Sequence, residues 1–182
     1  MIMNIWHDIN PDRIKPNDFI AVIEIEKGSK VKYELDKETG MLKMDRILYT
    51  STHYPANYGF IPRTYGFDND PLDVLVFCSE PIAPMSLVNV YPIGVITMND
   101  SGSSDEKIIA IPFEDPMYNC YKDIKALPAH IFEEMKHFFQ VYKELEYKKT
   151  VVDEISGHEK ALEIVQNAIH NYMSKYINNV SV

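Results

Sequence analysis

The chain has 182 residues, of which 46% are hydrophobic and 25% are charged, a composition typical of globular proteins that excludes a disordered or collagen-like chain. This length suits one domain, and we expect residues 1–182 to form it. The net charge of −9 argues against a nucleic-acid partner, because phosphate contacts need a surplus of Lys and Arg.

The first two-thirds of the chain shows the alternation of apolar and polar residues that is typical of strands. Residues 19–26 and 31–35 show it most clearly, and a Lys27-Gly28-Ser29 turn separates them. We expect further strands at residues 44–50, 73–78, 87–98 and 108–112. Short strands that are broken by Gly, Pro and Asp at this spacing indicate a small barrel or a strongly curled sheet.

The last third of the chain changes to a helical period. Between residues 127 and 146, apolar side chains recur every three or four positions, which predicts an amphipathic helix. A second helix is expected to begin at Ser156, because Ser156-Gly157-His158-Glu159 matches the capping box. The sequence therefore predicts a mainly β (α+β) fold with two helices near its C-terminal end.

No segment predicts a membrane or secreted protein. Residues 81–99 form the longest uncharged stretch, but three prolines make a membrane helix there unfavourable. The first eight residues lack a basic region that is followed by a long apolar run, so we expect no secretory signal. Cys78 and Cys120 have no metal-binding spacing, which favours reduced thiols in a cytoplasmic protein.

Three aspartates, Asp68, Asp70 and Asp73, stand within six residues of one another, directly before an apolar strand. If they converge, like charges repel by about 4 kcal/mol at about 4 Å and an effective dielectric of about 20, and a divalent cation would remove this repulsion. A solvated acidic turn is the alternative, since Asp, Asn and Pro are common in turns. A calcium loop of the EF-hand type fits poorly, because Asp73 stands where that loop needs Gly.

A second acidic stretch, residues 99–107, predicts a flexible polar loop. Carboxylates that are mixed with Lys and Arg suit an anionic ligand that arrives with a metal, and oxygen-only donors favour Mg²⁺ or Mn²⁺ over zinc. Two such ions could share and activate one water molecule. Strand alternation would aim several polar side chains at the same face of the barrel: Lys32, Glu34, Arg46, Tyr54 and Tyr58.

The segment Asp68-Asn69-Asp70-Pro71-Leu72-Asp73-Val74 resembles the signature of the soluble family I inorganic pyrophosphatases, Asp-x-Asp-Pro-x-Asp followed by an apolar residue. The similarity extends over nearly the whole chain, and the length resembles that of the short prokaryotic members. This resemblance implies a five-stranded closed barrel of OB-like shape that is flanked by two C-terminal helices. It also implies Mg²⁺-dependent hydrolysis of pyrophosphate to two phosphates, and a homo-oligomer, commonly a hexamer. Further matches lie at residues 23–25, 31–34, 45–46, 54–59 and 138–146.

The same resemblance assigns roles to individual residues. Asp70 is also our choice of general base toward a water that bridges two metals, because such a water needs only modest basicity from its partner. We expect Glu24, Glu34 and Tyr54 to form the wall of the pocket or to contact the residues that bind metal and substrate. The implied metal ligands are Asp68, Asp70, Asp73, Asp100 and Asp105. The implied substrate-binding residues are Lys32, Arg46, Tyr58, Lys107, Tyr142 and Lys143.

The chain departs from close bacterial relatives at two positions. Ser101 stands where many carry Glu, which bears on one water-mediated metal contact, and Val141 stands where some hexameric members carry His. Trp6 is expected to plug the end of the barrel, with a contact between subunits as the alternative.

Two other functions stay open at this stage. One is a metal-dependent phosphohydrolase for nucleotides or other organic phosphates, which the lack of an evident base-stacking platform disfavours. The other is a non-catalytic OB-like module that binds oligonucleotides or another partner, which the acidic charge opposes.

Overall fold

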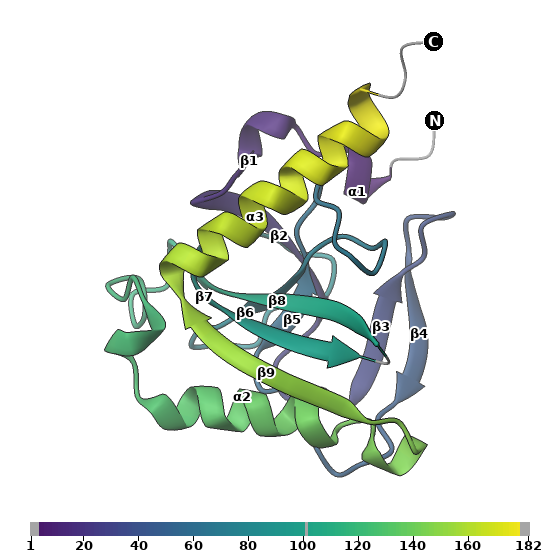
Figure 1. The fold of residues 1–182 in the computed structure, drawn as a ribbon, viewed down its shortest axis with the longest axis vertical. Helices are drawn as coiled ribbons and strands as arrows, with labels where there is room; N and C mark the ends of the chain where they lie inside the picture. Colours follow the sequence, from purple (N-terminus) through teal and green to yellow (C-terminus); the bar gives the residue numbers. More distant parts are fainter. Residues whose placement is uncertain (1–3, 101, 179–182) are drawn as a thin grey trace.

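Five strands close into a ring in the computed structural model, which describes residues 4–100 and 102–178 (Figure 1). Four neighbouring pairs in the ring are antiparallel, and the pair β6–β8 is parallel. A ring with an odd number of strands cannot alternate in direction throughout, so it needs a parallel pair. The expected five-stranded closed barrel is confirmed. Its strands, in order around the ring, are β2 (Asp18–Ile25), β5 (Asn57–Phe60), β6 (Asp73–Val76), β8 (Ser103–Pro112) and β7 (Leu87–Asp100).

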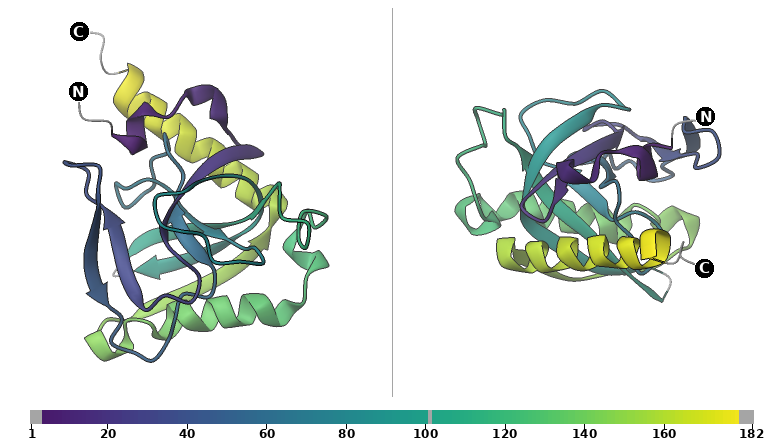
Figure 2. Two further views of the ribbon diagram at one scale, coloured as in Figure 1. Left: turned by 180° about the vertical axis from the view of Figure 1, so that it is seen from behind. Right: turned by 90° about the horizontal axis from the view of Figure 1, so that it is seen from above.

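The remaining strands extend the ring or stand beside it, and two long helices flank it (Figures 1 and 2). The other strands are β1 (Ile14–Lys15) on β2, β9 (Thr150–Gly157) on β7, and the separate hairpin of β3 (Val31–Leu35) and β4 (Leu42–Ile47). The helices are α1 (Ile5–Asp8), α2 (Ala129–Val141) and α3 (His158–Tyr172), which continues as a π-helical turn, Met173–Ile177. Short 3-10 turns lie at Pro11–Arg13, Ile124–Ala126 and Glu144–Glu146.

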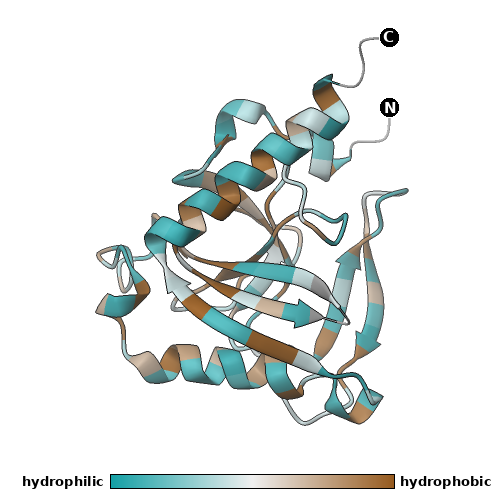
Figure 3. Cartoon of the chain, in the orientation of Figure 1, coloured by the Kyte–Doolittle hydropathy of each residue, from teal (hydrophilic) through white to brown (hydrophobic). Residues whose placement is uncertain are grey.

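The barrel strands are buried on both faces, and their alternating side chains divide between two apolar clusters that each include one of the long helices. Along β6, Val74 belongs to a cluster of apolar side chains that includes α3, whereas Leu75 belongs to a cluster that includes α2. Ile108 and Ile109 divide in the same way along β8, as the period of two requires. Hydrophobic and hydrophilic residues alternate around both helices in Figure 3, so each helix can bury one face.

Closure between β2 and β5 depends on a glycine. A Cβ atom at Gly59 would lie 1.8 Å from the carbonyl oxygen of Val22, closer than any side chain allows. The two backbones can therefore pair at this point only because Gly59 has no side chain.

Three expectations about local structure were wrong. The polar stretch 99–107, apart from Ser101, which lies outside the described residues, is not a loop but the end of a long β7–β8 hairpin, in which Asp100 pairs with Ser103 through the backbone. The strand expected at 44–50 begins earlier and ends earlier, at Leu42–Ile47. The helix expected over 127–146 ends at Val141, and its last turn is a separate 3-10 turn.

The capping box expected at Ser156 does not form. Ser156 lies in β9, and α3 begins only at His158, with Gly157 as its N-cap. The carboxylate of Asp123 instead accepts the His158 N–H at 2.9 Å, from a turn 35 residues earlier in the chain. A side chain at Gly157 would collide with this carboxylate, since its Cβ would lie 2.6 Å from Oδ2. A distant aspartate therefore replaces the local cap.

Asp123→Ala should lower the free energy of unfolding by about 1 kcal/mol, because two backbone N–H groups lose their acceptor. Urea unfolding at neutral pH measures the change. Asp153→Ala, an exposed residue on β9, is the matched control and should change stability much less. Equal losses in the two variants would contradict the distant cap.

Candidate active site

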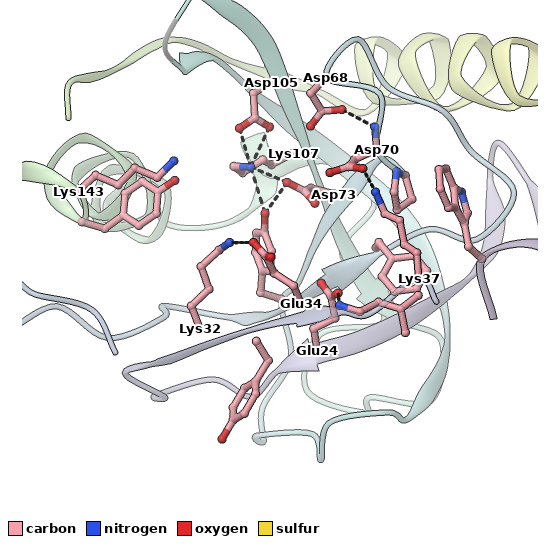
Figure 4. A pocket seen from close by; sticks show the side chains of 17 residues that line it. Glu24, Lys32, Glu34, Lys37, Asp68, Asp70, Asp73, Asp105, Lys107 and Lys143 are labelled. Atoms are coloured by element: carbon pink, nitrogen blue, oxygen red, sulfur yellow. Dashed lines mark hydrogen bonds and ion pairs between the residues drawn. The ribbon is translucent and has the colours of Figure 1, made fainter. Parts of the chain in front are cut away.

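A cavity of about 340 Å³ opens where β2, β3, β5, β6 and β8 meet the loop before β6 and the end of α2 (Figure 4). Tyr58 and Tyr142 contribute part of its wall. Six acidic residues and four lysines of the described chain also line it, and this mixture suits an anion accompanied by cations. They are Glu24, Glu34, Asp68, Asp70, Asp73, Asp105, Lys32, Lys37, Lys107 and Lys143.

Strand register places the central ion pairs. Asp73 on β6 stands directly beside Lys107 on β8, and Asp105 shares the face of Lys107 because it precedes it by two residues. The Lys107 ammonium is almost completely buried and donates to Asp73 Oδ2 at 2.7 Å and to Asp105 Oδ1 at 2.8 Å. Burial opposes its charge, but Asp105 and Asp73 outweigh this effect and hold the pKa of Lys107 well above its usual value. Lys107 therefore stays an ammonium.

Tyr58 completes this group from β5. Its hydroxyl donates to Asp73 Oδ2 and accepts from Lys107 Nζ at 3.1 Å. Burial, reinforced by Asp73, raises the pKa of Tyr58 well above its usual value, so it remains a neutral phenol. Tyr54 does not line the cavity but packs behind Tyr58, with their ring centres 5.4 Å apart.

Asp68 and Asp70 lie on a tight turn rather than on a strand. Asp68 Oδ1 accepts the Asp70 N–H at 3.0 Å, the Gly66 N–H donates to the Asp70 carbonyl at 2.8 Å, and Asn69 takes the positive φ of 71° that Asn tolerates. Burial raises the pKa of Asp68 to about 6, and the charges of Asp73 and Asp105 act in the same direction. The hydrogen bond from the Asp70 N–H lowers this pKa but does not offset the rise, of which burial is the main cause.

Glu24 reaches the cavity through a β-bulge, since the pairing of β2 with β5 shifts between Ile23 and Ile25. Its carboxyl oxygen Oε1 accepts the Leu35 N–H at 2.7 Å and so connects β2 to β3. Burial raises the pKa of Glu24 to about 8. On β3, Glu34 forms an ion pair with Lys32.

Arg46 stands opposite Lys32 in the β3–β4 hairpin but is not part of the cavity lining. Its guanidinium donates to Glu146 Oε1 at 2.8 Å and to Asp45, while Nη2 is buried with no hydrogen-bond partner among the described residues. At the end of α2, Tyr142 and Lys143 both line the cavity, with the Lys143 ammonium 5.2 Å from the Tyr142 ring centre.

Two positions that the sequence analysis named cannot be placed. The side chain of Asp100, an expected metal ligand, and all of Ser101 lie outside the described residues.

A sequence model of the inorganic pyrophosphatase family matches residues 21–173. The chain belongs to this family. Soluble inorganic pyrophosphatase 2 of Chlamydomonas reinhardtii is 49% identical over 94% of this chain and 90% of its own length. Soluble inorganic pyrophosphatase 1 of Arabidopsis thaliana is 48% identical over 94% of this chain and 81% of its own length.

Solved structures agree with the sequence comparison. The inorganic pyrophosphatase of Thermus thermophilus superposes with a TM-score of 0.89 at 36% identity and covers 93% of this chain and 99% of its own. That of Helicobacter pylori has a TM-score of 0.85 at 42% identity, over 88% of this chain and 96% of its own. The resemblance seen in the sequence is confirmed. This pyrophosphatase is an inorganic diphosphatase, which hydrolyses pyrophosphate to phosphate.

The family needs a divalent metal, and the donor chemistry of the cavity fits one. Asp68, Asp70, Asp73 and Asp105 all line the cavity and offer oxygen atoms only, the donors that hard divalent cations prefer. No three acidic, His or Cys side chains in the described part of the chain converge on one point. Lysines lie between the carboxylates instead, most visibly Lys107 in Figure 4.

Among the lining residues of this pyrophosphatase that were not expected there, Lys37 and Trp6 stand out by their contacts. Lys37, in the turn between β3 and β4, forms an ion pair with Asp70. Trp6 packs with Val22, Phe60 and Tyr172, a plug-like position, but it also lines the cavity. No local pattern shows that a turn lysine meets a partner 33 residues away, so the sequence offered no signal for Lys37.

The raised pKa of Glu24 predicts a pH-dependent stability. Folded Glu24 keeps its proton up to a pH of about 8, whereas the unfolded chain loses it near the ordinary value of 4.5. The unfolded state binds fewer protons between these values, so the wild-type free energy of unfolding falls as the pH rises through them. Lys32 and Glu34 on β3 and Asp73 on β6 face the same carboxyl group.

Glu24→Gln should therefore gain stability relative to the wild type from about pH 5 to about pH 8 and gain nothing more at higher pH. Urea unfolding in a chelating buffer at about pH 5, 7 and 9 measures this difference. Glu26→Gln is the control, because its carboxylate is exposed and should show no such trend. Parallel curves for the two variants would disprove the assignment.

Proposed function

We propose that Mg²⁺ is the metal of this pyrophosphatase, bound as several ions by Asp68, Asp70, Asp73, Asp100 and Asp105, with Mn²⁺ as a substitute. The observation that carries the proposal is the cavity in which carboxylates and lysines meet, since its donors are the hard oxygen atoms that these ions prefer. When bound, the ions would lower the pKa of a water molecule and offset charge on the departing phosphate.

Asp70 is the general base in this proposal. Its side chain is 53% exposed on the open turn, where a water molecule can reach the carboxylate. Asp73 and Asp105 are held by the buried Lys107 and, for Asp73, by Tyr58 as well. Asp70 can therefore accept a proton without breaking a buried ion pair.

The phosphates of the substrate would be held by positive groups that surround the aspartates. Lys32, Lys107 and Lys143 supply point charges, and Tyr58 and Tyr142 supply hydroxyl groups. Arg46 lies next to Lys32 across the hairpin, and its unpartnered Nη2 has a donor left for a phosphate oxygen.

Three residues support these groups indirectly in our proposal. Glu24 fixes the backbone of β3 at Leu35, and Glu34 orients the Lys32 ammonium. Tyr54 packs behind the ring of Tyr58.

We further propose that residues 1–182 act as one cytoplasmic domain without nucleic-acid or membrane partners. We also propose a homo-oligomer, and specifically a hexamer, because the chain resembles the short members of the family in length. The net charge of −9 supports this choice of partners. None of the helices in the described residues combines the length and apolar content needed to cross a membrane. Its role would be to remove the pyrophosphate that nucleotidyl-transfer reactions release.

Phosphate release from pyrophosphate should appear with Mg²⁺ and vanish with a chelator. Asp70→Asn should lower the rate by about 10²- to 10⁴-fold, because the amide cannot take the proton from water. Asp12→Asn, an exposed aspartate in an early turn, is the control and should keep the wild-type rate. Full activity in Asp70→Asn would remove Asp70 from the role of base.

Light scattering tests the assembly separately. The expected mass of the purified protein is six times that of one chain. A mass equal to one chain would rule out the hexamer and leave the catalytic proposal untouched.

A further inference from the structure

Lys37 lies between a carboxylate and an aromatic face at the edge of the cavity (Figure 4). Its ammonium forms an ion pair with Asp70 and lies 5.1 Å from the ring centre of Trp6. A cation gains from both neighbours, because the aromatic face is electron-rich and the carboxylate is charged. The lysine therefore has a defined resting position, although its side chain is 46% exposed.

Both partners of Lys37 are fixed to the same segment of the barrel. Trp6 is buried, and its Nε1 donates to the Thr64 carbonyl at 2.9 Å. The Thr64 hydroxyl accepts the Leu72 N–H at 2.8 Å, which closes the base of the loop that carries Asp70. Trp6 and the aspartate loop are thus anchored through one residue, and the Lys37 ammonium is the movable member of the group.

We propose that Lys37 is a tethered counter-ion that competes with the divalent metal for Asp70. The inference rests on the proposed role of Asp70 as a metal ligand. A metal ion at Asp70 would meet the positive charge of Lys37 and share the negative charge of the carboxylate with it, so metal binding there would be weakened unless the Lys37 ammonium moves away. Lys37 is then a positioning residue, which holds Asp70 toward the cavity and weakens the apparent affinity for metal.

Lys107 shows why exposure decides which lysine can exchange. Its side chain is only 3% exposed and is paired with Asp73 and Asp105, so leaving would strand two carboxylates in a buried place. Lys37 can instead swing into solvent, and exposed ion pairs of this kind contribute little. The competition should therefore be modest.

Mg²⁺ binding without pyrophosphate tests the proposal directly. Isothermal titration calorimetry should show that Lys37→Gln binds Mg²⁺ about two- to fivefold more tightly than the wild type. The fluorescence of Trp6, the single tryptophan of the chain, should change on Mg²⁺ addition in the wild type and much less in Lys37→Gln, because the displaced ammonium leaves the indole face.

Three further variants separate the pair from a general effect of charge. Lys37→Arg keeps the positive charge and should retain the wild-type affinity to within a factor of about two. Lys160→Gln removes a lysine that is paired with Glu163 on α3 and should change nothing. In an Asp70→Asn background, Lys37→Gln should cause no further tightening, since its partner is already neutral.

The outcomes distinguish this inference from the function on which it rests. Absence of Mg²⁺ binding in the wild type would overturn the proposed metal site itself. Wild-type binding with unchanged or weaker binding in Lys37→Gln would overturn only the role of Lys37. An equal rise in Mg²⁺ affinity in Lys160→Gln, or a rise that persists in the Asp70→Asn background, would also overturn it. Either result would show that the affinity depends on the overall charge of the protein and not on the Lys37–Asp70 pair.

Discussion

The site depends on one buried cation, the ammonium of Lys107 between Asp73 and Asp105. A buried charge is tolerable only when it is paired, and the pairing arises from the single parallel neighbour relation of the five-stranded ring. Parallel register sets Asp73 beside Lys107, and the period of two adds Asp105 on the same face. A ring with an odd number of strands must contain a parallel pair, and here that pair is the one that aligns Asp73 with Lys107. Closing the barrel therefore also assembles this part of the site.

Two kinds of neutralisation coexist around the cavity. Lys107 is enclosed and acts as a permanent part of the wall, whereas Lys37 and Asp70 face the solvent and can exchange partners. A site that binds a metal and a highly charged anion, and then releases two phosphates, needs a fixed ion pair as well as an exchangeable one. The buried Lys107 holds Asp73 and Asp105 close to each other, and the exposed pair leaves Asp70 accessible to solvent.

Local patterns predicted the parts of the structure that depend on neighbouring residues. Alternation located β2 and β3, and the aspartate signature located Asp68, Asp70 and Asp73. Features that depend on distant partners were out of reach: Asp123 caps α3 from 35 residues away, and Lys37 meets Asp70 across 33. Strand β5 escaped notice because four residues that are buried on both faces show no alternation.

The two ends of the described chain share in holding the aspartate loop. On one side, the carbonyl of Trp6 in α1 accepts the Arg63 N–H at 2.9 Å; on the other, the carbonyl of Ala168 in α3 accepts the Tyr65 N–H at 2.9 Å. The start of the loop is thus clamped between the first and last helices, which meet through His7 Nδ1 and the Tyr172 hydroxyl at 2.9 Å. Loosening either helix would therefore let Asp68 and Asp70 move while Asp73 and Lys107 stay in register. If these two aspartates bind the metal as proposed, metal binding should be lost before the barrel unfolds.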